Sequence, residues 1–370
     1  MDFFKFTDTV QTNFVNGQGF RGYETAMWVE RYREPGEFEF TAKLSSGLRE
    51  LLPTGTVISH TETLDVGIVE DHEIEESNDE DSVIRITGRM FPSYLENRIV
   101  GVNQAFGAPP APFTEYTLAA ANSDDQIVQL INDHILASFT ADDNDALDGN
   151  LQAVSSISTA LTSASRLIKR GPLWTRVAEL LAIDDLGIRT IRRNPFGSLG
   201  SDLNSYFLIH KGIDRSADVV FSVNMGDLER AKYLWSNRKL KNAALVQGRY
   251  TEVLVVGSET GYNRRTMLVD AQDIDGSLSA APSGGTLTSI RAKMTVRGQE
   301  ALAAQKVVDI VDTDISNTTR YQYRKDYDIG DIVSVQGTYG DIEKRRVVEF
   351  VEVEDENGQS GHPTLEVVGG

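Results

Sequence analysis

Apolar and polar residues alternate along much of the first hundred residues. In the stretch EFEFTAKL, every second residue from Phe38 to Leu44 is apolar and the residues between them are polar. This period of two is typical of a half-buried β-strand. The preceding stretch YETAMWVERYREPG ends in a Glu-Pro-Gly turn signal and therefore predicts a partner strand. We expect its aromatic residues Trp28 and Tyr32 to lie in the core rather than at an interface.

A long acidic hairpin is predicted next. Two strand-like runs, 66–74 and 83–87, flank the polar residues 77–81, where Asn and Asp favour a turn because their side chains bond nearby backbone amides. The hairpin carries a dense group of carboxylates, which comprises Glu73, Glu75, Glu76, Asp79 and Glu80. This group is either a solvated hairpin tip or a surface that faces a channel or a neighbouring subunit.

Helical patterns occupy the middle of the chain. Three prolines within residues 107–116 interrupt regular structure. After them, an apolar stripe with helical spacing comprises Ile127, Leu130, Ile131 and Ile135. A second helix is predicted between Pro172, which suits a first turn, and Gly187, which suits an end. The Ser/Thr/Ala-rich residues 151–165 fit either a weak helix or an extended linker.

The pattern returns to strands in the second half of the chain. The stretch NAALVQGRYTEVLVVG predicts a β-hairpin, and one helix is expected near residues 285–305. Residues 225–236 fit either a short helix or a strand. From Val333 onward apolar residues alternate again, and the Asn357-Gly358 pair is a strong turn signal between two strands.

Composition narrows the class of protein. The chain has 370 residues, of which 40% are hydrophobic and 25% charged, which suits two or three globular domains. The absence of cysteine excludes disulfides and thiolate chemistry. No apolar run is long enough for a membrane span, and we expect no secretory signal. The net charge of −19 disfavours binding of nucleic acid, although acidic walls suit a passage along which DNA slides; solubility is the simpler explanation.

The sequence contains no recognised catalytic or cofactor motif. Its five histidines lack zinc-site spacing, and no strand is followed by a Walker A loop, a G-x-G-x-x-G loop or a G-x-S-x-G elbow. Two acidic loops, 142–149 and 270–276, lack the spacing of a calcium-binding loop, so we interpret them as solvated turns. No catalytic, cofactor-binding or metal-ligating residue is therefore predicted.

Several separated stretches together resemble one protein family. They run from about Met27 to Val335 in the order AMWVERYREPGEFEF, VGIVEDHEIEESNDEDSVIRITGR, YLENRIV, GIDRSADVVFSVNMGDLERAKY, KNAALVQG and RYQYRKDYDIGDIVSV. Their order and spacing resemble those of the tail-tip hub proteins of long-tailed, non-contractile bacteriophages and prophages. Those proteins are similar in fold to the central baseplate hub of contractile phages.

The resemblance implies a fold and an assembly. The expected class is α+β, mainly β, with β-barrel-like hub domains at 1–105 and 201–370 and a mixed helical region at 106–200. A homotrimer would form a pseudo-sixfold ring around the path of the tape-measure protein and the DNA, which passes without specific binding. The other expected partners are the distal tail protein and central fibre or receptor-binding proteins. We expect a structural virion protein of the distal tail tip, assembled in the bacterial cytoplasm, with no enzymatic activity, no cofactor and no lytic extension after LEVVGG.

The resemblance also interprets two turn motifs. In YRKDYDIGDIVSVQG, Gly330 would allow a tight turn into a strand, and Asp328 and Asp331 would bond turn amides. In GIDRSADVVFS, Asp214 and Arg215 are expected in a turn or a buried ion pair. We interpret both motifs as architecture; a subunit contact and catalysis are the other interpretations of the acidic groups in the first motif.

Two further functions stay open at this stage. A carbohydrate-binding adhesin of the host surface would display exposed aromatic platforms. A cell-wall glycosidase would place two carboxyl groups roughly 5 to 9 Å apart across a sugar cleft.

Overall fold

The computed structural model describes most of the chain. The described residues are 1–6, 18–60, 63, 65–76, 82–100, 116–136, 151–159, 161–192, 205–226, 228–236, 238, 240–257, 259–272, 274, 284–303, 305, 308–315, 320–336 and 342–368. The acidic residues Asp79 and Glu80, the proline-rich residues 107–115 and the loop 142–149 lie outside them.

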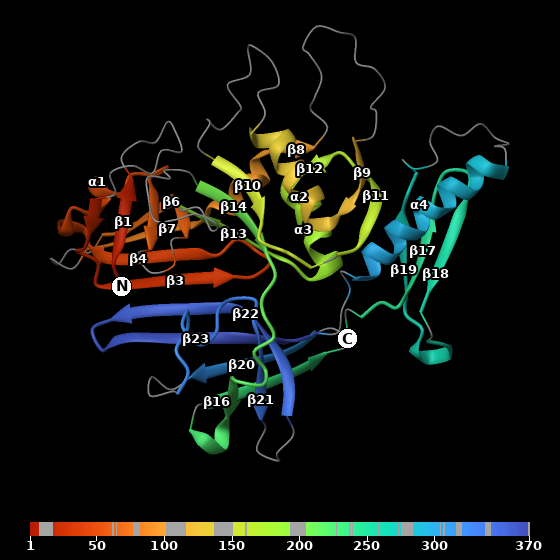
Figure 1. The fold of residues 1–370 in the computed structure, drawn as a ribbon. Coiled ribbons are helices and arrows are strands. Elements are labelled where there is room, and N and C mark those ends of the chain that lie inside the picture. Colours follow the sequence, from red (N-terminus) through yellow and green to blue (C-terminus); the bar gives the residue numbers. More distant parts are fainter. Residues whose placement is uncertain are drawn as a thin grey trace, which may run out of the picture.

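A large, almost entirely antiparallel sheet joins the two ends of the chain. Strands β3 (Thr25–Arg31) and β22 (Ile342–Asp355) pair at its centre and lie side by side in Figure 1. The N-terminal half continues from β3 through β4 (Glu37–Lys43), β7 (Val83–Met90), β6 (Val66–Glu75), β5 (Val57–His60), β1 (Phe3–Phe6) and β2 (Gln18–Phe20). The C-terminal half continues from β22 through β23 (Gly358–Val367), β20 (Val308–Ile315) and β16 (Leu228–Ser236). Strand β21 (Ile332–Gln336) pairs with β22, and β15 (Val220–Ser222) pairs with β21 in parallel.

Two aromatic-rich cores lie on the same face of this sheet. In the register between β3 and β22, Trp28 is opposite Glu352 and Glu30 is opposite Phe350, so all four side chains share one face. The first core includes Phe3, Phe20, Trp28, Phe38, Phe40, Leu48, Ile58, Ile84 and Ile86. The second includes Tyr32, Phe221, Tyr327, Ile329, Val333, Val347, Phe350 and Leu365.

The middle region packs two helices against a mixed three-stranded sheet. Helices α2 (Ser123–Ile131) and α3 (Leu173–Asp184) pack on each other and share a core with β10 (Leu151–Ser155) and β14 (Ser205–His210). Strand β13 (Gly187–Ile191) completes that sheet. Two small strand pairs flank it: β9 (Tyr116–Asn122) with β11 (Ser163–Ile168), and β8 (Ile99–Val100) with β12 (Gly171–Pro172).

A separate lobe lies beyond the middle region in Figure 1. Helix α4 (Gly284–Ala303) covers one face of a three-stranded sheet made of β17 (Ala243–Gln247), β18 (Glu252–Val256) and β19 (Thr266–Asp270). The remaining short helices are η1 (Leu44–Ser46), α1 (Leu48–Leu51), η2 (Phe91–Asn97), η3 (Asn132–Leu136), η4 (Val223–Met225) and η5 (Gly261–Asn263).

Most locally predicted elements are confirmed. The hairpins β3–β4, β6–β7, β17–β18 and β22–β23 form as expected, and so do helices α2, α3 and α4. Of the two open choices, residues 228–236 form strand β16 and no helix. Residues 151–165 contribute β10 and the start of β11, so neither a weak helix nor an extended linker describes them. Helix α3 ends at Asp184 and is capped by Asp185, which has a left-handed φ of 60°; the predicted end at Gly187 is therefore wrong. Gly187 instead begins β13, where an added Cβ would lie 2.3 Å from the Tyr32 ring.

The fold class is mainly β with helices, as predicted. Within the described residues, however, none of the sheets closes into a barrel, so the barrel-like form of the two end regions is not confirmed. The boundaries at 105 and 200 stay predictions.

Candidate functional site

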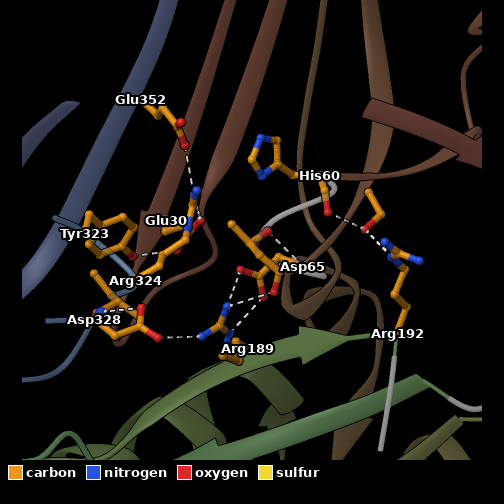
Figure 2. Close-up of polar contacts among 12 residues, drawn as sticks. Glu30, His60, Asp65, Arg189, Arg192, Tyr323, Arg324, Asp328 and Glu352 are labelled. Carbon is orange, nitrogen blue, oxygen red and sulfur yellow. Dashed lines mark hydrogen bonds and ion pairs between the residues drawn. The ribbon is translucent and has the colours of Figure 1, made fainter. Parts of the chain in front are cut away.

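A buried ionic junction joins three parts of the chain. Figure 2 shows carboxylates and arginines from β3, from β13, from the segment before β21 and from β22 meeting between the sheet and the middle region. These elements bring together residues that lie far apart in the sequence. The junction gathers buried carboxylates and arginines from distant parts of the chain, so we treat it as the candidate site.

Arg324 holds two carboxylates at once. Its guanidinium donates to Glu30 at 2.7 Å and to Glu352 at 2.9 Å, and both acids are about 95% buried. The hydroxyl of Tyr323 donates to the other oxygen of Glu30 at 2.6 Å, and the Tyr323 ring stacks on Phe350. Arg324 has a left-handed φ of 66°, which directs its side chain from a tight turn into this site.

Arg189 forms the second half of the junction. Its guanidinium binds both oxygens of Asp65, at 2.9 and 2.7 Å, in the two-point geometry that arginine and carboxylate favour. The same group lies 3.7 Å from Asp328. Arg189 therefore links the loop before β6, strand β13 and the segment that leads into β21.

Burial and the nearby arginines shift the pKa values of these carboxylates in opposite directions. Four carboxylates share two arginines here; Glu30, Asp65 and Glu352 are buried, and the side chain of Asp328 is 47% exposed. Burial raises the pKa of Asp65 to about 6, against the attraction of Arg189. Burial also raises the pKa of Glu352. Burial alone would raise the pKa of Glu30, but Arg324, Arg189 and the Tyr323 hydroxyl together hold it below its ordinary value.

Two neutral histidines lie next to the junction. His60 packs against the rings of Phe3 and Trp28, and neither of its ring nitrogens has a hydrogen-bond partner among the described residues. Burial and the nearby Arg324 lower the pKa of His60 to about 4. Burial with two arginines lowers the pKa of His210 to about 3. Both rings are therefore uncharged at neutral pH.

The junction has no room for a substrate. The cavity beside Glu30, Asp65 and Arg189 measures about 20 Å³, which is the space of a single water molecule. Its carboxylates face arginines and not an open cleft. The arrangement therefore fixes the relative position of three chain segments and offers no place for a sugar ring.

The predicted turn motifs meet at one edge of the junction. Asp331 accepts bonds from the amides of Ile213 at 2.7 Å and Asp328 at 3.1 Å, and pairs with Arg215 at 2.8 Å. Asp328 accepts the amide of Ile329, and Gly330 has a φ of +90°. The first motif thus forms the turn that enters β21, and Asp331 joins it to the second motif.

The other predicted residues lie on the surface. Asp214 accepts the amide of Ser216 at 3.0 Å and pairs with Lys344 at 2.8 Å, which lowers the pKa of Asp214. Glu73, Glu75 and Glu76 are exposed, and they lie apart from the junction. Their predicted role at a lumen or a subunit contact stays a prediction.

Sequence reasoning missed the junction itself. Glu30 and Glu352 each occupy an inward position of an alternating strand, after Trp28 and Phe350 respectively. A charged residue at a core position is a detectable signal, because a buried charge requires a partner. The partner arginine could not be identified from spacing, since 294 residues separate Glu30 from Arg324.

The described residues show neither a metal cluster nor a membrane-spanning helix. No group of three or more His, Asp or Glu side chains is arranged to hold an ion in this part of the chain. Of the helices that the structure describes, none is both long and apolar enough to cross a bilayer. Asp270, from the second acidic loop, pairs with Lys169 at 2.6 Å.

The fold is that of phage tail proteins. It is similar to the 43 kDa tail protein of prophage MuSo2 from Shewanella oneidensis, with a TM-score of 0.55 and 12% identity over 99% of this chain and 97% of that chain. The tail protein from Neisseria meningitidis MC58 matches with a TM-score of 0.53 and 12% identity over 99% of this chain and 95% of that chain. No curated protein sequence matches the chain.

The chain belongs to the siphovirus ReqiPepy6 Gp37-like protein family, whose model matches residues 15–365. The resemblance to tail proteins of long-tailed phages, seen in the sequence, is thereby confirmed.

Proposed function

We propose that the chain is a structural subunit of the phage tail tip. Three copies form a hub that closes the distal end of the tail tube and surrounds the path of the tape-measure protein and the DNA. The observation that carries this proposal is the family match over residues 15–365. The similarity of fold to two tail proteins over nearly their whole length supports it.

The edges of the large sheet support a ring of subunits. Eight strands, from β6 through β3 and β22 to β16, alternate in direction without interruption. Strand β5 covers β6 only from Val66 to Ile68, and within the described residues no strand pairs with the outer edge of β16. Open edges of this kind pair readily with another chain. Pairing of β6 in one copy with β16 in the next preserves the alternation and closes a ring.

The proposal extends to the domains, the partners and the assembly of the hub. The two halves of the sheet, each with its own core, act as the two barrel-like hub domains, and the middle region and the α4 lobe face neighbouring proteins. We propose the distal tail protein, the tape-measure protein and central fibre or receptor-binding proteins as partners. The hub has no enzymatic activity in this proposal, since the carboxylates of the junction are closed around arginines. Assembly takes place in the host cytoplasm.

Mass measurement and imaging test the proposal. Light scattering of the purified chain should give three times the mass of the chain. A gold-labelled antibody against the chain should mark only the distal tip of the tail in electron micrographs of virions. A monomeric mass together with particles that carry no label would refute the hub.

A host-surface adhesin is the second candidate. Tyr250 and Tyr262 are exposed, and Tyr262 is fully so, which is the kind of aromatic surface that sugars bind. Direct binding of the purified chain to host cells, lost in a Tyr262→Ala variant, would favour this function. Retained tip labelling without cell binding would favour the hub.

A further inference from the structure

The large sheet has a second, polar face opposite its two cores. In β4, Phe38, Phe40 and Ala42 point into the first core, so Glu37, Glu39, Thr41 and Lys43 point the other way. Because paired residues in neighbouring strands lie on the same side of the sheet, the register defines this face from β6 to β23. Its members include Asp71, Glu73, Glu75, Arg85, Thr87, Arg89, Thr25, Met27, Arg31, Glu349, Val351, Val353, Asp355, Ser360, His362 and Thr364.

Each arginine on this face lies between two carboxylates. Arg31 pairs with Glu37 at 2.6 Å and with Glu349 at 2.7 Å, across the seam between the two halves of the sheet. These bonds raise the pKa of Arg31 even though the group is half-buried.

The same arrangement recurs twice on β7. Arg85 pairs with Glu39 at 2.8 Å and lies 3.6 Å from Glu73. Arg89 pairs with Glu70 and Glu96, each at 2.8 Å. Each set of three groups has a net charge of −1, so the described arginines of this face have no charge left for another anion.

The bulk of the chain determines which face of a ring turns inward. Both aromatic cores lie on the core face. Phe3, Phe20 and Ile58 of β1, β2 and β5 pack into the first core, and Phe221 and Val333 of β15 and β21 pack into the second, so these strands add their bulk on that side. The inner wall of a ring has less room than the outer wall. When the sheet closes through β6 and β16, the thin polar face therefore turns to the inside.

We propose that this polar face lines the passage of the hub, and that its paired carboxylates keep Arg31, Arg85 and Arg89 from binding the phosphates of the passing DNA. This inference rests on the proposed function. Guanidinium is the side chain best suited to grip a phosphate, and each gripped phosphate would slow a strand that must move freely. An arginine held by two carboxylates keeps the sheet tied together and presents a net negative charge to DNA.

Two double variants release one arginine each. Glu37→Gln with Glu349→Gln frees Arg31, and Glu39→Gln with Glu73→Gln frees Arg85. The matched control is Glu252→Gln with Glu259→Gln, which removes the same charge from exposed positions on the α4 lobe. Light scattering first establishes that every variant remains a trimer.

The readout is binding of linear double-stranded DNA to the purified trimer at several salt concentrations. We expect no binding by the parent chain or the control. The released variants should bind, and the plot of log K against log salt should steepen by about 0.9 for each of the three freed arginines in the ring. Trimers of the released variants that bind DNA no better than the control would overturn the inference while leaving the hub intact.

Cysteine labelling tests the position of the face separately. The chain has no cysteine, so Thr41→Cys and the control Thr260→Cys each introduce a single thiol. In the trimer, a small maleimide should label both, and a bulky polymer maleimide should label only Thr260→Cys. Rapid labelling of Thr41→Cys by the bulky reagent would overturn the inward orientation. A chain that never forms a trimer would instead refute the proposed function and this inference with it.

Discussion

Gly330 lies directly against the ring of Tyr32. A Cβ built on Gly330 would be 2.4 Å from Cε2 of that ring, and the φ of Gly330 is +90°. Tyr32 cannot move aside easily, because it is fully buried and its hydroxyl donates to the carbonyl of Asp185 at 2.8 Å. We expect Gly330→Ala to lower the free energy of unfolding by about 2–4 kcal/mol, from backbone strain and overpacking. Urea unfolding at pH 7 measures the loss.

Gly358 provides the matched control for this contact. Its φ is +118°, but an added Cβ would meet nothing within 4 Å. Gly358→Ala should therefore cost only the strain of the left-handed backbone, about 1 kcal/mol. Equal losses in the two variants would show that the contact with Tyr32 contributes nothing.

The junction predicts a large effect at Arg324. Replacing Arg324 with Met keeps most of the volume but leaves Glu30 and Glu352 buried without the cation that is hydrogen-bonded to both. We expect the free energy of unfolding to fall by about 3–5 kcal/mol at pH 7. The loss should shrink at pH 5, because the two acids then take up protons more readily in the variant. Urea unfolding at both pH values tests this.

The neighbouring Lys325 provides the control for Arg324, because it carries the same charge at an exposed position. Its side chain is exposed to solvent and has only a 3.4 Å bond to Gln322. Lys325→Met should change the free energy of unfolding by no more than about 0.5 kcal/mol. A loss at Arg324 that matches the loss at Lys325 would contradict the assignment of a buried ionic junction.

The Tyr323 hydroxyl predicts a smaller and more local effect. Tyr323→Phe keeps the ring stacked on Phe350 and removes only the 2.6 Å bond to Glu30. A hydrogen bond to a charged acceptor contributes about 1.5–3 kcal/mol, so a loss in that range is expected in thermal or urea unfolding. Tyr262→Phe, at a fully exposed position, is the control and should leave stability unchanged. No loss at Tyr323 would mean that water replaces the hydroxyl.

Local patterns explain which parts of the fold were predictable. The hairpin β3–β4 follows from alternation between Thr25 and Lys43, since adjacent strands separated by a short turn need no distant information. The pairing of β3 with β22 joins residues more than 300 positions apart, and nothing in either strand specifies the other. Strand β16 shows the same limit, because its sequence fits a helix as well as a strand and its pairing with β20 decides the outcome.

In the candidate site, too, the local turn could be predicted from the sequence and the long-range contacts could not. The turn at Gly330 was predictable, because Asp and Gly in that order favour a tight backbone and its amide bonds. The network around Glu30 and Arg189 was not, because its charges come from five separate parts of the chain: β3, β13, β22, the loop before β6 and the segment before β21. The sequence predicted the polar positions of single strands, such as the outward residues of EFEFTAKL, but not the strand order that joins them into one face.

The buried His60 predicts a dependence of stability on pH. Its pKa is lowered to about 4 in the folded state, from about 6.5 when unfolded. Between these values the unfolded chain binds the extra proton, so this histidine makes the protein less stable as the pH falls from 6.5 to 4. Asp65, with its pKa raised to about 6, makes the protein more stable as the pH falls over part of this range.

Comparing His60→Phe with the parent chain therefore isolates the contribution of the histidine. The parent should lose about 3 kcal/mol more than the variant between pH 7 and pH 4, measured by urea unfolding. Equal losses in the two proteins would mean that His60 can take up its proton in the folded state, in conflict with its burial against Phe3 and Trp28.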